Sequence, residues 1–245
     1  MRLAHVLLAA SLILPAPALL AQTSGDGYRF GVPDARFTLH AGYAHAFAQS
    51  DVFDEAIRFL TLERSSFSAP DIGGDFSFTV APRLDVSLTA DYSAAVRESE
   101  DRGYLDNNNL PIQQTTSFRR APFMANVTLY LTPRGRSIGK LAWIPARVVP
   151  WVGAGGGATW YRFMQEGDFV NYQTLNVFTA VLSSSGWAST AQASAGVDFT
   201  LTPNLALTLD ARRYWASAKP SDDYRTYDKI DLSGVTGALG LTLRL

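Results

Sequence analysis

The residues with the clearest chemical potential are two histidines beyond the N-terminal segment. His40 and His45 lie five positions apart, so on a β-strand they point to opposite faces and cannot bind one metal ion together. A hydrolytic site would need a histidine beside a serine and a carboxylate, and neither histidine has such a motif nearby in the sequence. We therefore predict no catalytic, cofactor-binding or metal-binding residues, and we expect both histidines to have packing roles.

Charged side chains form the second set of candidates, because they recur on the polar side of stretches in which apolar and polar residues alternate. If these stretches enclosed an interior, opposite charges inside it would have to pair, since an unpaired buried charge is costly. Such a set would act as an ion-pair plug that stabilises the interior or as a narrow polar path. The ion-pair candidates are Asp75, Asp85, Asp91, Asp198, Asp210, Arg212 and Arg244.

The composition limits which elements could position these residues. The chain has 245 residues, of which 47% are hydrophobic and 18% charged, and it contains no cysteine. The lack of cysteine excludes disulfide scaffolds, thiol catalysis, cysteine-ligated zinc and a lipoprotein anchor. A formal net charge of -1 gives no support to nucleic-acid binding. No stretch beyond the N-terminus approaches the roughly 20 apolar residues of a membrane-spanning helix.

Residues 1–21 have the layout of a secretory signal peptide. Arg2 precedes an apolar run from Val6 to Leu14, and prolines and small residues follow. We expect this segment to be removed on export, which leaves one domain over residues 22–245.

The remaining chain alternates between apolar and polar residues with a period of two, which is typical of β-strands. In residues 84–92, for example, Leu84, Val86 and Leu88 share one face, while Asp85 and Asp91 lie on the other. The pattern predicts eight strands, over residues 36–47, 72–80, 84–97, 114–131, 147–163, 187–201, 205–216 and 229–245.

The connections between these strands alternate in length. Turns 81–83 and 202–204 are tight and centred on proline, whereas connections 48–71, 98–113, 164–186 and 217–228 are long and polar. The alternation predicts a short turn at connection 132–146, but this connection is long. We expect its charged residues, Arg134, Arg136 and Lys140, to be solvated. Helical spacing predicts short loop helices over Asp51–Glu63 and Asp168–Leu182, which could cover the barrel mouth.

These observations predict an all-β fold, an eight-stranded antiparallel transmembrane β-barrel with long extracellular loops and short loop helices. His40 would then point into the barrel, and His45 would lie near the outer interface. A soluble lipocalin-like barrel or a secreted sandwich is the alternative, since alternation looks the same whichever face is apolar. Two belts of aromatic residues near the strand ends favour a barrel that spans a membrane. We place Tyr43, Phe47, Tyr92, Trp160, Tyr161, Trp187 and Trp215 in the belt toward the long loops, and Phe37, Phe78, Tyr130, Trp151 and Phe199 in the belt toward the short turns.

The whole chain after residue 21 resembles small bacterial outer-membrane β-barrel proteins, the broad group that includes the OmpA-like and OmpW-like eight-stranded barrels. The resemblance is carried by the signal segment, the proline-centred turns, the glycine-rich run 150–158 and the last strand, 239–245. In this group the last strand is recognised by the barrel assembly machinery and usually ends in an aromatic residue; here the alternation matches but the last residue is Leu245. The resemblance implies a monomer in the outer membrane of a Gram-negative cell envelope, with outer-membrane lipid and lipopolysaccharide as partners.

Two classes of function remain open, because a fold does not define an activity. We expect a non-enzymatic barrel with a structural, surface-interaction or porin-like role in the passage of small or apolar solutes. The alternative is a membrane-embedded lipid-modifying enzyme, similar to a lipid A acylase or deacylase. A histidine or serine within hydrogen-bond reach of a carboxylate on the outer-leaflet lipid face would distinguish the second class.

Overall fold

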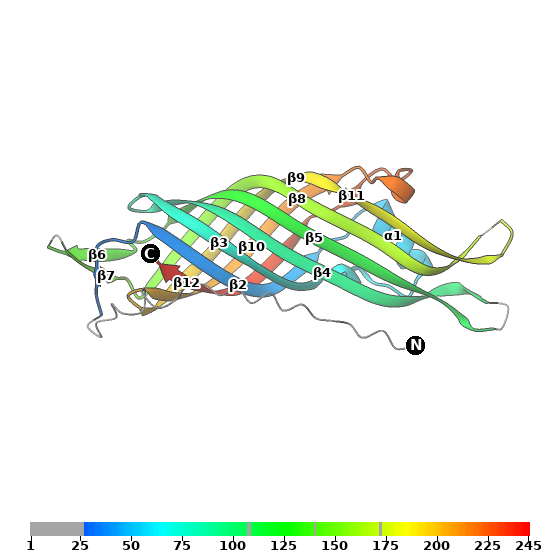
Figure 1. Cartoon of the computed structure of the whole chain (residues 1–245), viewed down its shortest axis with the longest axis horizontal. Helices are drawn as coiled ribbons and strands as arrows, with labels where there is room; N and C mark the ends of the chain where they lie inside the picture. Colours follow the sequence, from blue (N-terminus) through cyan, green and yellow to red (C-terminus); the bar gives the residue numbers. More distant parts are fainter. Residues whose placement is uncertain (1–26, 107–108, 140, 172) are drawn as a thin grey trace, which may run out of the picture.

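Eight antiparallel strands close into a single ring (Figure 1), as predicted. The computed structural model describes residues 27–106, 109–139, 141–171 and 173–245, so the predicted signal peptide lies outside the described residues. The ring follows the order β10, β12, β2, β3, β4, β5, β8 and β9, and a β9–β10 ladder closes it. The strands are β2 (Ala35–Ala46), β3 (Ala69–Ala81), β4 (Leu84–Leu105), β5 (Pro111–Tyr130), β8 (Val148–Val170), β9 (Val177–Thr202), β10 (Leu205–Ala218) and β12 (Gly234–Arg244).

The strand register fixes the stagger of this barrel. A row of paired residues that starts at Ser189 on β9 passes around all eight strands and returns to β9 at Phe199, ten residues further along. This shear tilts the strands, which is what allows eight strands to close around an interior that side chains can fill.

The outer face of the barrel wall is apolar and its inner face is polar, as expected for a barrel that spans a membrane. Leu88 on the outer face is 62% exposed, whereas Asp85 on the inner face of the same strand is 1% exposed. A soluble barrel would reverse this arrangement, so the lipocalin-like alternative is wrong. Large apolar side chains are exposed around the outer wall, among them Leu39, Ile72, Leu88, Val127, Leu209 and Leu241. Within the described residues, no helix has the length and apolar character needed to cross a bilayer.

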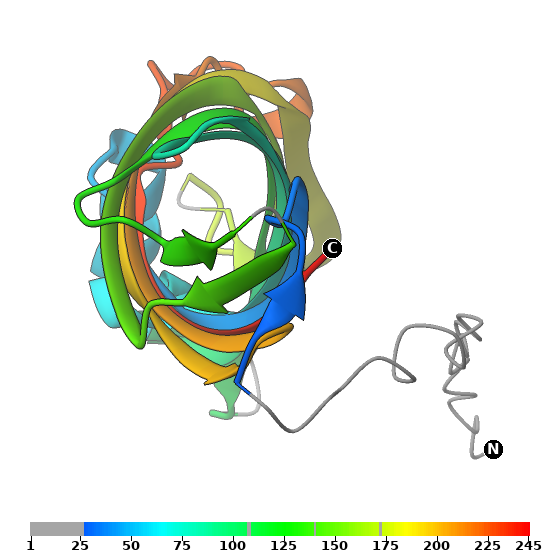
Figure 2. The same ribbon diagram turned by 90° about the vertical axis from the view of Figure 1, so that its left-hand side faces the viewer.

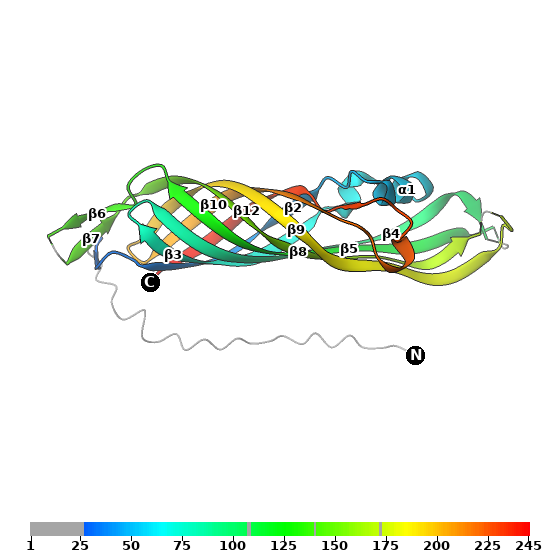
Figure 3. The same ribbon diagram turned by 90° about the horizontal axis from the view of Figure 1, so that it is seen from above.

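Four neighbouring strands, β4, β5, β8 and β9, continue well past the barrel at the end where the long connections lie (Figure 3). They exceed the other four strands by roughly ten residues, which corresponds to about 30 Å of extended chain. We call this projecting part, beyond residue 97 of β4, the outer sheet. The helix predicted over residues 168–182 is wrong, because Val170 pairs with Val177 and Phe169 with Phe178 as the β8–β9 ladder continues to its turn.

The first long connection folds over the barrel mouth beside the outer sheet. It forms helix α1 (Asp51–Phe59), which confirms the first predicted loop helix, and a short 3-10 turn, η1 (Arg64–Phe67). Asp51 and Asp54 lie in the first turn of α1, where negative charge suits the helix dipole. The connection before β12 adds a second 3-10 turn, η2 (Asp222–Tyr224), and a short strand, β11 (Ile230–Asp231). Strand β11 lies within residues 229–245, which were predicted to form one continuous strand.

The other end of the barrel carries a small sheet that was not predicted. The long connection between β5 and β8 forms a hairpin of β6 (Gly135–Ile138) and β7 (Ala142–Pro145), and β7 also pairs with β1 (Arg29–Phe30). In Figure 2 this hairpin, drawn in green, crosses the barrel opening. The length of connection 132–146 is therefore explained by the β6–β7 hairpin that it contains.

Candidate functional site in the barrel interior

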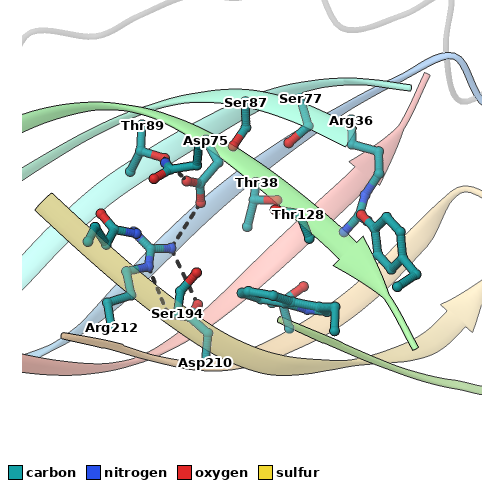
Figure 4. Close-up of a pocket in the computed structure, with 15 residues that line it drawn as sticks. Arg36, Thr38, Asp75, Ser77, Ser87, Thr89, Thr128, Ser194, Asp210 and Arg212 are labelled. Atoms are coloured by element: carbon teal, nitrogen blue, oxygen red, sulfur yellow. Dashed lines mark hydrogen bonds and ion pairs between the residues drawn. The ribbon is translucent and has the colours of Figure 1, made fainter. Parts of the chain in front are cut away.

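A layer of charged side chains crosses the middle of the barrel around Arg212 (Figure 4). The Arg212 guanidinium donates to three carboxylates from different strands, at 2.9 Å to Asp210, 3.0 Å to Asp75 and 3.2 Å to Asp91. Arg212, Asp91 and Asp210 are buried, and Asp75 is half-buried. Inward-facing positions on β3, β4 and β10 place these groups, so the layer ties three separate strands together. We call it the Arg212 layer.

His40 completes this layer on β2. Its Nε2 atom lies 2.7 Å from Asp91, and its Nδ1 atom lies 3.2 Å from Asp75. A ring that faces a carboxylate on each side is fully hydrogen-bonded only when both nitrogens carry a proton. The Tyr214 hydroxyl donates to the second oxygen of Asp91 at 2.8 Å. His40 therefore lies inside, as expected, but as a member of the charged network rather than as a simple packing residue.

A second charged layer lies nearer the short-turn end. Arg36 pairs with Asp198 at 2.7 Å, and the Tyr130 hydroxyl donates to Asp85 at 2.7 Å while also accepting a hydrogen bond from Arg36. Arg134 reaches in from the β5–β6 connection and donates to Asp85 at 3.0 Å. We call this set the Arg36 layer. Its partners come from β2, β4, β5 and β9, so it also crosses the whole barrel.

Arg244 departs from the predicted set. It points inward near the short-turn end, but no carboxylate of the described residues lies within 4.0 Å of it. Its guanidinium instead donates to the Thr200 hydroxyl at 2.9 Å and lies 5.8 Å from the centre of the Trp143 ring. Arg244 therefore contacts the small sheet at this end rather than an ion-pair partner.

Several members of the two layers were not predicted from the sequence. Arg36 has the same strand parity as Thr38 and His40, a signal that could have found it. Tyr130 and Trp151 were placed in the aromatic belt toward the short turns, which is wrong, because Tyr130 is buried and the Trp151 indole donates to Asp198 inside the barrel. Tyr161 was placed in the belt toward the long loops, which is also wrong, because it is buried in the cluster that includes residues of α1.

Two small, separate cavities lie inside the barrel. A cavity of about 40 Å³ lies between the two charged layers, and one of about 20 Å³ lies on the loop side of the Arg212 layer. A cavity of roughly 10–15 Å³ already accommodates a water molecule, so these spaces hold a few waters at most. The smaller cavity is lined by Asp71 and Arg120, and the Oδ2 atom of Asp71 has no hydrogen-bond partner among the described residues. A water in this cavity would satisfy it.

An apolar cluster closes the barrel mouth above these cavities. Phe53 of α1 is fully buried, and its ring centre lies 4.6 Å from Phe67, 5.1 Å from Phe118 and 5.6 Å from Phe163. The Tyr224 hydroxyl of η2 donates to Gln165 at 2.6 Å, and burial raises the pKa of this hydroxyl well above its ordinary value. We call this cluster the cap; its other buried members include Ala48, Val52, Leu60, Leu62, Tyr161, Ile230 and Leu232.

One group of side chains has the composition of a metal site. His40, Asp71 and Asp91 present ligand atoms within 4.8 Å of one another. The Arg212 guanidinium, however, lies 3.2 Å from Asp91, and the His40 ring is already hydrogen-bonded to the same carboxylate. These cationic and donor groups take the place that a metal ion would occupy.

The lipid-facing wall contains a histidine–serine pair. His45 is exposed on the outer face, as expected, and its Nδ1 atom lies 3.1 Å from the buried Ser68 hydroxyl. The Ser68 hydroxyl also accepts a hydrogen bond from the Ala46 backbone N–H. In the part of the chain that the structure describes, no carboxylate lies within 4.0 Å of the His45 ring. The pair therefore lacks the third group that would orient the histidine for nucleophilic catalysis.

The closed ring, the polar interior and the apolar exterior together define a transmembrane β-barrel of eight strands. Comparison with known protein families and with curated proteins gave no match.

Solved structures of low sequence identity do resemble this chain. The outer membrane protein OprG from Pseudomonas aeruginosa is 13% identical, covers 87% of this chain and 97% of its own, and gives a TM-score of 0.45. Neisserial surface protein A is 14% identical, with coverages of 85% and 97% and a TM-score of 0.43. The attachment invasion locus protein Ail of Yersinia pestis is 13% identical, with coverages of 86% and 99% and a TM-score of 0.43.

Proposed function

We propose that this protein is a non-enzymatic outer-membrane barrel that carries the outer sheet on the cell surface and does not conduct solutes. The observation that carries the proposal is the closure of the interior at separate levels, by the cap, the Arg212 layer and the Arg36 layer. A path along the barrel axis would have to displace buried charges from their partners, which is energetically costly. Of the roles expected from the sequence, surface interaction therefore fits best.

The outer sheet supplies a surface for such an interaction. Its β8–β9 ladder is continuous as far as Val170 and Val177, and Arg102 of β4 donates to the backbone carbonyls of Leu60 and Leu62 in the α1 connection. The outer sheet also contains a recess of about 490 Å³, lined in part by Glu98, Glu100 and Glu166. In the orientation that places the long connections outside the cell, this partly acidic surface faces an extracellular partner.

Conductance in planar lipid bilayers tests the closed interior directly. We expect the purified full chain to insert without producing discrete current steps, because the cavities inside the barrel hold only a few waters. Heat-modifiable mobility on a gel, measured on the same sample, serves as the control that the inserted protein is folded. Reproducible single-channel steps from folded protein would contradict the proposal and would favour a role in solute passage.

A further inference from the structure

Two arginines face each other on the outer wall of the barrel. Arg119 on β5 and Arg162 on β8 are direct register partners, and both face outward, because their sequence neighbours on each strand are buried on the inner face. Like charges in directly opposite positions destabilise a sheet, so the pair needs a compensating anion. Among the described residues no carboxylate lies within 4.0 Å of either guanidinium. Arg162 has only a weak contact with the Met164 sulfur, at 3.9 Å, and Arg119 has no side-chain hydrogen bond within the same residues.

The pair lies at a defined height on the wall. Trp160 is two residues from Arg162 towards the barrel, and its register partner Trp187 packs against Phe123 with ring centres 5.8 Å apart. Such aromatic residues mark the boundary between hydrocarbon and headgroups, so the two arginines lie about 7 Å along the strand beyond it, among the headgroups.

Acidic residues lie on the same outer face, further from the membrane than the two arginines. Glu98 on β4 and Glu166 on β8 are both register partners of Thr115, which lies four residues beyond Arg119 on β5. An anion bound at this face would be repelled by the two glutamates if it moved further from the membrane. The surface charge therefore favours an anion at one height only, that of the arginine pair.

An apolar groove begins below the same arginines, on β2, β3, β4, β5 and β8, which are neighbours in the ring (Figure 1). Its volume is about 560 Å³. Its lining combines small residues, among them Ala90, Ala125 and Gly156, with the aromatic residues Phe37, Phe76 and Phe123. Phe123 lies four residues below Arg119, or about 13 Å along the strand. The groove thus starts within the hydrocarbon region, directly under the headgroup position.

We propose that Arg119, Arg162 and this groove bind one phosphorylated lipid of the outer leaflet, of the lipid A type found in lipopolysaccharide. The two guanidinium groups bind its phosphate, a geometry to which arginine is well suited, and one acyl chain occupies the groove. The positive pair and the apolar groove are complementary to a ligand that is anionic at one end and apolar at the other. This inference rests on the proposed location in the outer membrane, but it is independent of whether the barrel conducts.

Native mass spectrometry of the full chain in detergent, titrated with diphosphorylated lipid A, tests the site. We expect lipid A lacking its phosphates to bind at least about tenfold more weakly, because a charged hydrogen bond is worth roughly a factor of ten in affinity. The double variant Arg119→Gln/Arg162→Gln should lose affinity for diphosphorylated lipid A by a similar factor. The matched control is Arg83→Gln/Arg136→Gln, which removes the same charge from exposed arginines at the short-turn end and should bind normally.

A groove variant and a soluble competitor separate the two halves of the site. Ala125→Phe fills the groove from the outer wall and should weaken lipid A binding several-fold while leaving the heat-modifiable mobility unchanged. Inorganic pyrophosphate at matched concentration should displace little lipid, because it lacks an acyl chain. Equal binding of lipid A with and without phosphates, normal binding by the arginine double variant, or efficient displacement by pyrophosphate would each overturn the proposal. A barrel that failed these tests yet stayed silent in planar bilayers would leave the proposed function intact.

Discussion

Replacing Arg212 by alanine should lower the free energy of unfolding by about 3–5 kcal/mol, the loss typical of removing one partner from a buried ion pair. Arg212 is the common partner of Asp75, Asp91 and Asp210, at 2.9–3.2 Å. Without it, three carboxylates from β3, β4 and β10 remain close together inside the barrel, with His40 as their nearest cation. Urea unfolding of the protein in lipid vesicles measures the change, and the folded band on a gel should be lost at a lower temperature.

Two companion variants show whether charge is the cause. Arg213→Ala removes the neighbouring arginine, which faces outward with its guanidinium 3.9 Å from the Phe47 ring centre, and should cost about 0.5–1 kcal/mol. Arg212→Ala combined with Asp210→Asn should recover part of the lost stability, because one stranded charge is removed. If Arg212→Ala unfolds at the same urea concentration as the unchanged protein, the Arg212 layer does not stabilise the barrel.

The strands were predictable because their signal is local. A period of two is set by the pleat of each strand and does not depend on how the sheet closes. Leu84, Val86 and Leu88 therefore indicate one shared apolar face before any partner strand is known. Where the ladder runs beyond the membrane this signal weakens. Leu175 lies in the turn of the β8–β9 hairpin and Phe178 lies on β9, yet their separation of three residues in the sequence imitates one face of a helix.

The sequence predicted which charged residues face the barrel interior, but it did not predict which of them form ion pairs with one another. Arg212 and Asp75 are 137 residues apart, and their contact depends on the ten-residue stagger that develops over the whole ring. No local pattern contains that stagger. Arg134 illustrates a different limit, because a loop residue has no strand parity, and only the path of the β5–β6 connection brings it to Asp85.

Replacing Phe53 by alanine should open the cap while leaving the barrel folded. Truncating a fully buried phenylalanine costs about 3–5 kcal/mol, and Phe53 is in contact with Phe67, Phe118 and Phe163. Helix α1 has nine residues, too few to be stable without packing, so the loss falls on its docking against the mouth. We expect amide hydrogen exchange over residues 51–59 to accelerate by at least about a hundredfold, since each 1.4 kcal/mol is a factor of ten.

Phe178→Ala provides the matched control for this change. Phe178 is 48% exposed on the outer sheet, where it stacks on Phe169 with ring centres 5.9 Å apart, so its truncation should leave exchange in α1 unchanged. The urea midpoint of the barrel should fall much less in Phe53→Ala than in Arg212→Ala, because the ladders and both charged layers do not involve α1. An equal fall in both variants would mean that cap and barrel unfold as one unit. Separate responses would mean that the mouth can open locally while the charged layers keep the interior closed.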